Sequence, residues 1–383
     1  VFDSRCPMGG GGSKPQPAAD LDYTTLVCTC SHDGRMRVWD AEFSGAVLSE
    51  VEVSREAEVS AAAIFPSGDL VVLAVADGSV QVFHVSGSRQ AHCQAHTEAV
   101  KGLSITSDGS TLASCSVDGT VRLWDASQLA VGGDLGLRLQ TLEGHQGSVN
   151  GIAFFPDGER IVSASSDCTV RVWPTYSRQR LNPDERAAQR KRTKVLKNHT
   201  SSVYCVAVFP DGTKFVSGST DFTARVWDAK TFRTLQQLKG HSGPIRGLAI
   251  FPDSSRIVTG SWDGSAIVWD AGGKKKRIRE SEPPLGVSTI STISSFDGST
   301  ESDEWNRGGA RVRHVLRGHS SYVYSVAVSP DGQKICTAGL DNTARVWNSS
   351  TGRVLFALKG HADAVSCIQV FPTIGGPDAD MSP

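Results

Sequence analysis

The sequence of 383 residues predicts an all-β chain built from repeated antiparallel sheets. Short apolar runs alternate with polar residues at a period of two, and turn residues interrupt them roughly every eight to twelve positions, which is typical of antiparallel strands. Residues 144–173 contain one whole unit, with an alternating run from Val149 to Phe154, a Pro-Asp-Gly turn at 156–158 and a last run that ends at Trp173. This unit recurs along most of the chain and therefore predicts a repeat architecture.

The composition is that of a globular protein without extremes. Hydrophobic residues make up 39% of the chain and the formal net charge is −1, which excludes a globally basic or acidic protein but not local patches. The longest apolar run, 70–76, is far shorter than the roughly 20 residues of a spanning helix, so we expect no membrane insertion. No charged-then-apolar leader follows Val1, so we expect no signal peptide. Nine cysteines without paired spacing indicate reduced thiols and an intracellular location, either cytoplasmic or nuclear.

Five segments share one set of spacings. Each has a His, an Asp 22 positions later, a Trp six positions further on, and a hydroxyl residue four positions before the Asp. The five sets are His96, Ser114, Asp118, Trp124; His145, Ser163, Asp167, Trp173; His199, Ser217, Asp221, Trp227; His241, Thr259, Asp263, Trp269; and His319, Thr337, Asp341, Trp347.

These segments resemble the WD40 family of β-propellers, whose repeats run from a Gly-His pair to a Trp-Asp pair. Gly-His stands at 144–145, 240–241, 318–319 and 360–361, and Trp-Asp stands at 39–40, 124–125, 227–228 and 269–270. The resemblance covers about 24–372. It implies that the Asp, the imidazole, the hydroxyl and the indole N–H of a repeat form one buried chain of hydrogen bonds, which would hold two loops of a blade together.

Two places depart from the pattern. Segment 55–83 keeps its apolar runs but has Arg55, Leu73 and Phe83 where His, hydroxyl and Trp are expected, which predicts a blade without the network. At the chain ends, Thr29, Asp33 and Trp39 lack a His and an inner strand, whereas His361 and the run 364–371 supply only those parts. Counting inner strands gives seven. We therefore predict a seven-bladed WD40 β-propeller, closed by pairing the C-terminal inner strand with three N-terminal strands, which removes the open sheet edge.

The domain organisation follows from the same alignment of repeats. We expect a disordered Gly/Pro-rich tail at 1–22, the propeller at 23–372 and a second disordered tail at 373–383. Three long inserts, 126–137, 174–193 and 271–310, each separate the Trp strand of a repeat from its outer strand. In an up-and-down blade this position places all three on one face, opposite the Asp turns.

Two of these inserts are basic. Residues 178–197 hold eight basic and two acidic residues, with a helix signal beginning at Asn182, and 274–279 is a second basic run. Such runs suit nuclear import or nucleic-acid contact, and a solvated loop is the plainer interpretation.

The sequence predicts no catalytic residue, no cofactor and no metal site. A Ser-His-Asp set such as Ser163, His145 and Asp167 suggests a hydrolase, but the set recurs in several blades and no oxyanion donors accompany it, which favours a structural role. Cys28 and Cys30 would share a strand face without a second pair to complete a metal site. The glycines at 9–12 lack the Gly-Lys-Ser/Thr ending of a phosphate loop.

A partner site is expected on the face of the Asp turns. In WD40 proteins, contacts often come from the positions three and five after the His and from the position before the Asp. In three consecutive blades these positions carry large aromatic or Arg side chains, which are enriched at interface hot spots. We therefore predict a partner-binding patch with an exposed indole, unless the tyrosines pack inward. The predicted patch consists of Tyr204, Arg246, Trp262, Tyr322, Tyr324 and Leu340.

The sequence thus favours a monomeric, non-catalytic scaffold that binds a protein or peptide through this patch. Two alternatives remain open. One is a nuclear RNA-associated WD40 protein that contacts nucleic acid through its basic loops. The other is a ubiquitin-ligase substrate receptor, because such proteins often carry Trp-Asp-x-Arg after the Trp strand and this chain has Trp227-Asp228-Ala229-Lys230.

Overall fold

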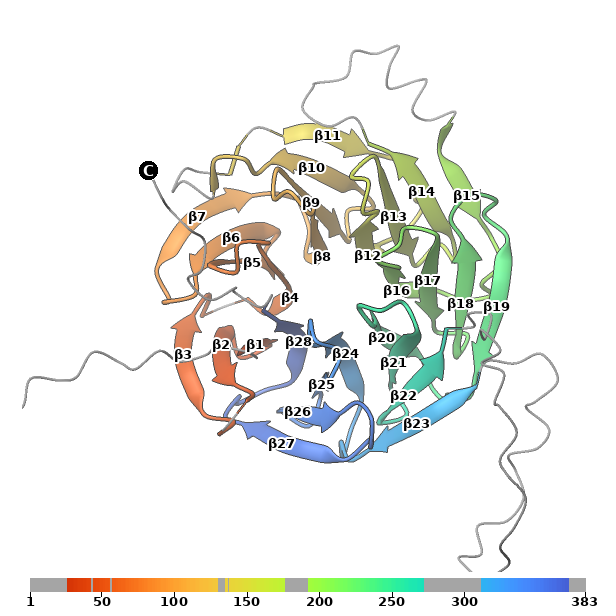
Figure 1. Ribbon diagram of the computed structural model, residues 1–383. Helices are drawn as coiled ribbons and strands as arrows, with labels where there is room; N and C mark the ends of the chain where they lie inside the picture. The colour runs from red at the N-terminus through yellow and green to blue at the C-terminus, as the bar shows by residue number, and fades with distance from the viewer. Residues whose placement is uncertain are drawn as a thin grey trace, which may run out of the picture.

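The computed structural model describes residues 26–42, 44–55, 57–129, 135–136, 138–175, 192–271 and 311–371. Within them, 28 β-strands form seven four-stranded antiparallel sheets that surround a common axis (Figure 1). The prediction of an all-β, seven-bladed propeller is therefore confirmed. Both predicted tails and most of the three inserts, including the helix expected from Asn182 and the basic run 274–279, lie outside the described residues.

We number the blades in chain order and place the sheet that joins the two ends last. Their strands, from the axis outward, are β4 (Val59–Ile64), β5 (Leu70–Val75), β6 (Ser79–His84) and β7 (Arg89–Gln94) in blade 1; β8 (Val100–Ile105), β9 (Thr111–Ser116), β10 (Val121–Asp125) and β11 (Arg138–Leu142) in blade 2; β12 (Val149–Phe154), β13 (Arg160–Ser165), β14 (Val170–Pro174) and β15 (Lys194–Leu196) in blade 3; β16 (Val203–Val208), β17 (Lys214–Ser219), β18 (Thr223–Asp228) and β19 (Thr234–Lys239) in blade 4; β20 (Ile245–Ile250), β21 (Arg256–Ser261), β22 (Ser265–Asp270) and β23 (Val312–Arg317) in blade 5; β24 (Val323–Val328), β25 (Lys334–Gly339), β26 (Thr343–Asn348) and β27 (Val354–Lys359) in blade 6; and β28 (Val365–Val370), β1 (Leu26–Ser31), β2 (Arg35–Asp40) and β3 (Val47–Glu52) in blade 7.

Blade 7 combines strands from the two ends of the described chain. The inner strand β28 pairs antiparallel with β1, and Val27 lies opposite Val370 while Cys30 lies opposite Cys367. Backbone hydrogen bonds extend the pairing, because the N–H of Phe371 donates to the carbonyl of Leu26 at 2.9 Å. In Figure 1 the blue β28 accordingly lies beside the red-orange β1, β2 and β3.

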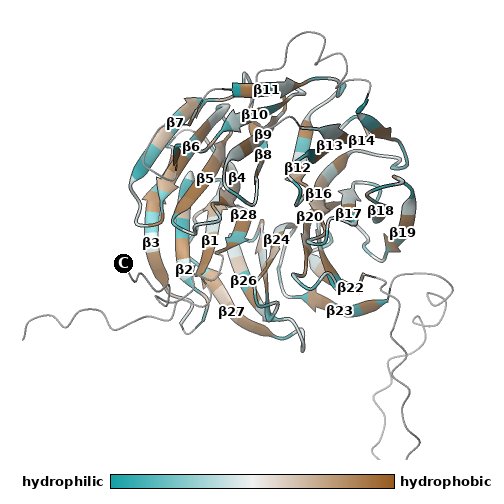
Figure 2. Ribbon diagram, turned by 45° about the horizontal axis from the view of Figure 1, so that its top comes forward, coloured by the Kyte–Doolittle hydropathy of each residue, from teal (hydrophilic) through white to brown (hydrophobic). Residues whose placement is uncertain are grey.

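Burial explains why the strands differ in composition. A middle strand such as β9 is buried at every position because neighbouring blades cover both of its faces. The outer strand β3 alternates between exposed and partly buried residues. Figure 2 shows this contrast, with teal and brown segments along the outer strands β3 and β7. Strands covered on both faces need apolar or small residues throughout, whereas a half-covered strand needs them only at every second position.

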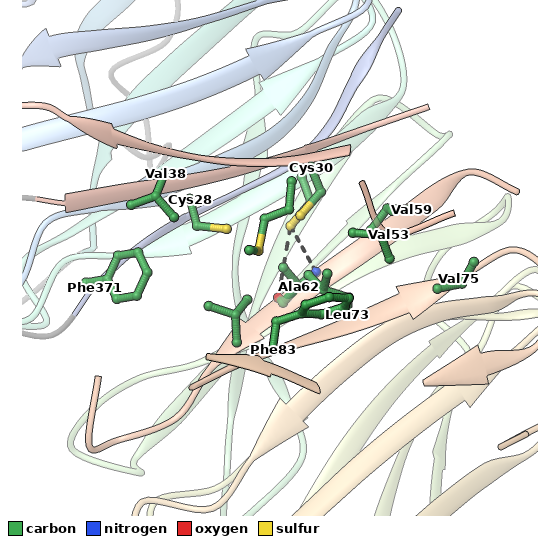
Figure 3. Packing of buried hydrophobic residues seen from close by; sticks show 13 residues of the cluster. Cys28, Cys30, Val38, Val53, Val59, Ala62, Leu73, Val75, Phe83 and Phe371 are labelled. Carbon is green, nitrogen blue, oxygen red and sulfur yellow. Dashed lines mark hydrogen bonds between the residues drawn. The ribbon is translucent and has the colours of Figure 1, made fainter. Parts of the chain in front are cut away.

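The blade interfaces contain the hydrophobic core. Between blades 7 and 1, the core includes Cys28 and Val38 on one side and Val59, Leu73 and Phe83 on the other (Figure 3). Leu73 and Phe83 occupy the positions where other blades have a hydroxyl and a Trp, and they are 0% and 4% exposed. Blade 1 therefore replaces a polar network by apolar packing, and each such buried side chain contributes roughly 1.5–3 kcal/mol.

The Asp turns and the inserts lie at opposite ends of the blades. In blade 5 the Asp turn joins β21 to β22, and the chain leaves β22 for the insert at Asp270. It returns at Arg311, whose carbonyl accepts the N–H of Asp270 at 2.9 Å. Blades 2 and 3 follow the same order, because their inserts also connect the third strand to the outer strand. In these three blades the described chain enters and leaves the insert at the end opposite the Asp turns.

Candidate functional site

Each repeat except that of blade 1 contains the hydrogen-bonded set expected from the spacing. In blade 3, Asp167 Oδ2 lies 2.8 Å from His145 Nδ1, Ser163 Oγ lies 2.8 Å from His145 Nε2, and the indole N–H of Trp173 donates to Ser163 Oγ at 2.8 Å. Equivalent contacts join His96, Ser114, Asp118, Trp124; His199, Ser217, Asp221, Trp227; His241, Thr259, Asp263, Trp269; His319, Thr337, Asp341, Trp347; and, across the closure, His361, Thr29, Asp33, Trp39.

These hydrogen bonds fit a neutral His and an ionised Asp. In a neutral His145 the N–H at Nδ1 donates to Asp167, so Nε2 accepts the proton of Ser163, whose oxygen also accepts the indole N–H of Trp173. Burial lowers the pKa of His145, and the hydrogen bond that its imidazole donates to Asp167 only partly opposes this. Burial by itself would raise the pKa of Asp167, but the hydrogen bonds from His145 and Thr169 hold it well below its ordinary value.

This geometry gives no access to a substrate. Ser163 is 0% exposed, and its hydroxyl is already engaged by both the indole and the imidazole. A nucleophile must reach the reacting atom of a substrate. The Ser-His-Asp sets therefore act as structural ties between the His loop and the Asp turn of each blade.

The Gly-His pairs have a steric cause. A Cβ atom on Gly240 would lie 2.9 Å from Cη2 of Trp269, and one on Gly318 would lie 3.0 Å from Cη2 of Trp347. The indole that donates to the hydroxyl thus packs directly against the residue before the His. Glycine at this position allows the indole to reach the hydroxyl without displacing the loop.

A ring of seven side chains lines the axis at the end that carries the Asp turns. Each is the second residue of an inner strand and stands five positions after the His position of its repeat. The ring consists of Ser60, Lys101, Asn150, Tyr204, Arg246, Tyr324 and Ser366, one from each blade, and all seven line a cavity of about 480 Å³.

Some ring members connect neighbouring blades. The side-chain amide of Asn150 donates to Val203 O of blade 4 at 3.0 Å, and the hydroxyl of Ser366 donates to Val59 O of blade 1. The hydrogen bonds of these two side chains therefore join adjacent blades of the propeller. Lys101 is exposed and makes no hydrogen bond or ion pair with any described residue.

The middle of the predicted patch is a cluster around Arg246. Its guanidinium carbon lies 3.9 Å from the ring centroid of Tyr204, 5.4 Å from that of Trp262 and 5.6 Å from that of Tyr324. These rings come from blades 4, 5 and 6. Cation–π attraction of this kind contributes about 0.5–2 kcal/mol per contact. Arg246 thus draws the aromatic side chains of three blades together, and Tyr204, Arg246 and Tyr324 line the cavity.

The other three members of the patch lie outside the cavity lining. Trp262 stacks on Tyr322, with ring centroids 5.0 Å apart and planes inclined by 15°. Tyr322 is 40% exposed, and its carbonyl accepts the backbone N–H of Leu340 at 2.9 Å. Leu340 is partly buried.

The expectation of an exposed indole was wrong. Trp262 is partly buried, and its indole nitrogen is shielded from solvent and has no hydrogen-bond partner among the described residues. Tyr322 stacks on the indole and the guanidinium of Arg246 lies over it, so Tyr322, at 40% exposed, is the more exposed ring of the pair.

The sequence reasoning missed Ser60 and Glu58, because blade 1 lacks the His from which the positions are counted. The same spacing counted from Arg55 finds both, at five and three positions. Glu58 is the acidic residue of the cavity lining, and it lies 3.7 Å from His32 Nε2 with its side chain 53% exposed. The Oγ atom of Ser60 is buried without a hydrogen-bond partner in the described part of the chain.

Other sequence features have local roles. Cys28 and Cys30 belong to the apolar core in Figure 3, and a hydrogen bond with Cys28, together with burial, raises the pKa of the Cys30 thiol well above its ordinary value. Asp228 of the Trp-Asp-Ala-Lys segment accepts hydrogen bonds from the backbone N–H groups of Lys230 and Thr231, so it closes a local turn.

The described residues contain no group of three or more His, Cys, Asp or Glu that could hold a metal ion. Within the described residues, no helix has the length and apolar character needed to span a membrane.

Comparison with known proteins agrees with this geometry. The WD domain, G-beta repeat of the WD40 family matches residues 20–40, 87–125, 136–174, 190–228, 232–270 and 310–348, which together exceed half of the chain. The chain belongs to the WD40 family. Residues 55–83, which form most of blade 1 without its network, fall between two matched segments.

Several curated proteins share part of this sequence. WD repeat-containing protein 90 of Xenopus tropicalis is 32% identical over 106 residues, which are 27% of this chain and 6% of that protein. Apoptotic protease-activating factor 1 of Homo sapiens is 26% identical over 123 residues, 30% of this chain and 10% of that protein. Periodic tryptophan protein 2 of Arabidopsis thaliana is 32% identical over 101 residues, 26% of this chain and 11% of that protein. The matched stretches thus span about a tenth or less of these relatives.

Proposed function

We propose that the chain is a non-catalytic, monomeric interaction scaffold that binds a partner protein or peptide at the end carrying the Asp turns. The binding surface consists of Tyr204, Arg246, Trp262, Tyr322, Tyr324 and Leu340. Membership of the WD40 family supports the general role, because propellers of this family commonly hold protein partners. The observation that carries the proposal is the cluster in which Arg246 contacts three aromatic rings from three blades.

Two further facts support this surface. Tyr322 adds an exposed aromatic ring beside the cluster, and exposed aromatic residues with an adjacent Arg are the residue types enriched at interface hot spots. The end of the propeller with the Asp turns also lies away from the entry points of the three inserts, which we propose occupy the opposite face. The eight described cysteines are all free, which supports a reducing, intracellular compartment.

Affinity purification with the wild-type chain, followed by binding measurements on the recovered proteins, tests the proposal. Tyr322→Ala removes the exposed ring without emptying the core, and it should weaken binding of a true partner by about 2 kcal/mol or more. The matched control is Leu355→Ala on β27, because Leu355 is 44% exposed on the outermost strand of blade 6, whereas the proposed surface lies at the inner strands and the Asp turns. Leu355→Ala should bind as tightly as wild type. If Tyr322→Ala also does, the surface is wrongly placed. Salt-dependent retention on an RNA matrix with no protein partner would favour a nucleic-acid function instead.

A further inference from the structure

Arg246 carries a charge that no acidic group of the described chain neutralises. Its side chain makes no hydrogen bond or ion pair with any described residue, and the guanidinium lies over the rings of Tyr204, Trp262 and Tyr324. A half-buried cation without an anion is unfavourable unless water or a ligand satisfies its donors. The guanidinium of Arg246 therefore has unused hydrogen-bonding capacity inside the cavity.

Other arginines of the propeller form ion pairs with carboxylates. Arg37 lies 3.3 Å from Asp33 Oδ2 and 2.9 Å from Glu50 Oε2, and Arg122 lies 3.3 Å from Asp118 Oδ2. Arg246 differs because its ring position faces the axis, where the neighbouring blades 4 and 6 contribute Tyr204 and Tyr324 but no carboxylate to the cavity lining. The Glu58 carboxylate that does line the cavity comes from blade 1 and lies 3.7 Å from His32 Nε2.

The N–H groups of Arg246 are available to a ligand. They lie in the guanidinium plane, and none of them donates a hydrogen bond to a described residue. The in-plane donors match the two oxygens of a carboxylate or a phosphoryl group, which bind arginine through two parallel hydrogen bonds. Several other donors of the cavity lining are also unused: the ammonium of Lys101, the buried hydroxyl of Ser60, and the hydroxyls of Tyr204 and Tyr324, none of which has a hydrogen bond to a described residue.

The same cluster disfavours a cationic ligand. Tyr204, Trp262 and Tyr324 would otherwise resemble an aromatic box for a methylated ammonium group, which binds to ring faces. Arg246 already occupies those faces, and Lys101 adds a second positive charge to the lining. Cations entering the cavity would be repelled by both.

We infer that the axial cavity is an oxyanion subsite, in which Arg246 binds a carboxylate or phosphoryl group carried by a side chain of an acidic peptide segment of the partner. Lys101, across Asn150 and Tyr204 in the ring, provides the second positive charge. Charge complementarity selects this occupant, and the adjacent Tyr322–Trp262 stack provides the apolar surface for the rest of the peptide. The inference rests on the proposed function and specifies the chemistry of the ligand.

Synthetic peptide pools test the inference without knowledge of the partner. All pools are random except for one fixed central residue, which is Glu, phosphoserine, Gln or trimethyl-lysine. Fluorescence anisotropy measures their binding to wild-type chain, to Arg246→Met and to Arg256→Met. The last is a matched control, because Arg256 also stacks on an aromatic ring, 3.6 Å from the centroid of Phe251, but at the opposite end of blade 5.

The wild-type chain and Arg256→Met should bind the Glu or the phosphoserine pool about ten- to a hundredfold more tightly than the Gln pool, as expected for a hydrogen bond to a charged group. Arg246→Met should lose this preference and gain affinity for trimethyl-lysine. The better of the Glu and phosphoserine pools identifies the source of the oxyanion.

The possible failures are distinguishable. If the wild-type chain binds the Gln pool as tightly as the two anionic pools, or prefers trimethyl-lysine, the oxyanion inference is overturned while the binding surface stands. If Tyr322→Ala also leaves the binding of every pool unchanged, the proposed surface is overturned together with it. The wild-type comparison decides the inference even if Arg246→Met does not fold.

Discussion

Thr29 and His361 lie 332 positions apart in the chain, and the threonine Oγ1 is 2.8 Å from the imidazole Nε2. The indole N–H of Trp39 donates to the same hydroxyl at 2.7 Å, and Asp33 Oδ2 lies 3.0 Å from His361 Nδ1. One network therefore ties the loop before β28 to β1, β2 and the turn between them. Its effect on stability is open to measurement.

Deletion of residues 361–383 should open the ring. It removes β28 and His361, which exposes the edge of β1 in blade 7 and the inner faces of blades 6 and 1, and exposed strand edges promote aggregation. Size-exclusion chromatography and thermal melting provide the measurement. Deletion of 372–383 alone is the control, because β28 then stays in place. A monomeric 361–383 deletion that melts like wild type would contradict the role of β28 in closure.

The network of blade 5 should behave as one unit in a double-mutant cycle. His241→Ala and Asp263→Ala each leave a buried partner without its hydrogen bond and should each lower the free energy of unfolding by about 1–3 kcal/mol. The double variant should cost less than the sum, because both changes break the same network. Urea denaturation measures all three. Arg55→Ala, at the His position of blade 1, should change stability little, because Arg55 is 86% exposed. Additive costs for His241 and Asp263 would mean that the two side chains are not coupled.

The Gly-His pairs allow a matched steric test. Gly240→Ala puts a Cβ 2.9 Å from Cη2 of Trp269, and overpacking of this kind typically costs about 1–3 kcal/mol. Gly360→Ala puts its Cβ 3.4 Å from Cη2 of Trp39, so it should cost clearly less. Thermal melting of the two variants checks the order. Equal melting temperatures would show that the indole does not limit the residue before the His.

Stability should fall as the solution becomes mildly acidic. Burial lowers the pKa of His96, His145, His319 and His361 from the ordinary value of 6.5, so the folded chain stays neutral at these sites where the unfolded chain takes up protons. The free energy of unfolding should therefore decrease below about pH 6.5, with a slope of up to about 1.4 kcal/mol per pH unit for each imidazole.

A second loss should follow in stronger acid. The pKa values of Asp33 and Asp341 lie below the ordinary 3.8, since hydrogen bonds from the backbone, neighbouring hydroxyls and His residues outweigh the opposing effect of burial. Their stabilisation is complete above about pH 4 and is lost as the pH falls through the lower folded-state pKa. Urea denaturation between about pH 7 and pH 3 records both phases. A free energy of unfolding that stays constant from about pH 7 to pH 5 would contradict the buried neutral imidazoles.

The fold could be predicted from the sequence because the same polar spacings and the same strand pattern recur in successive repeats. Five repeats use the same four polar residues at fixed spacings, and seven inner strands alternate in the same way, so a departure such as Leu73 and Phe83 in blade 1 is recognisable against the others. Spacing also located Tyr204, Arg246 and Tyr324 on inner strands near one end of the axis.

Spacing could not predict how those side chains turn. Trp262 stands before Asp263 in the turn between β21 and β22, where an exposed side chain is expected. Its indole nitrogen is nevertheless buried, because Trp262 stacks on Tyr322 and contacts Arg246. Such rotamer choices depend on side chains from neighbouring blades, which lie tens of residues away in the sequence. Ser60 and Glu58 were missed for a different reason, because the His that anchors the count is absent from blade 1.

The placement of β28 also sets the order in which the chain can fold. Strands β1, β2 and β3 are synthesised first but belong to a sheet whose inner strand is the last described strand to be made. Domains commonly begin to fold during synthesis, and pairings between distant residues form slowly. Blades 1 to 6 each comprise consecutive strands and can assemble as they emerge from the ribosome. Blade 7 must wait with an unpaired β1 edge, which makes the nascent chain a natural client for chaperones until β28 arrives.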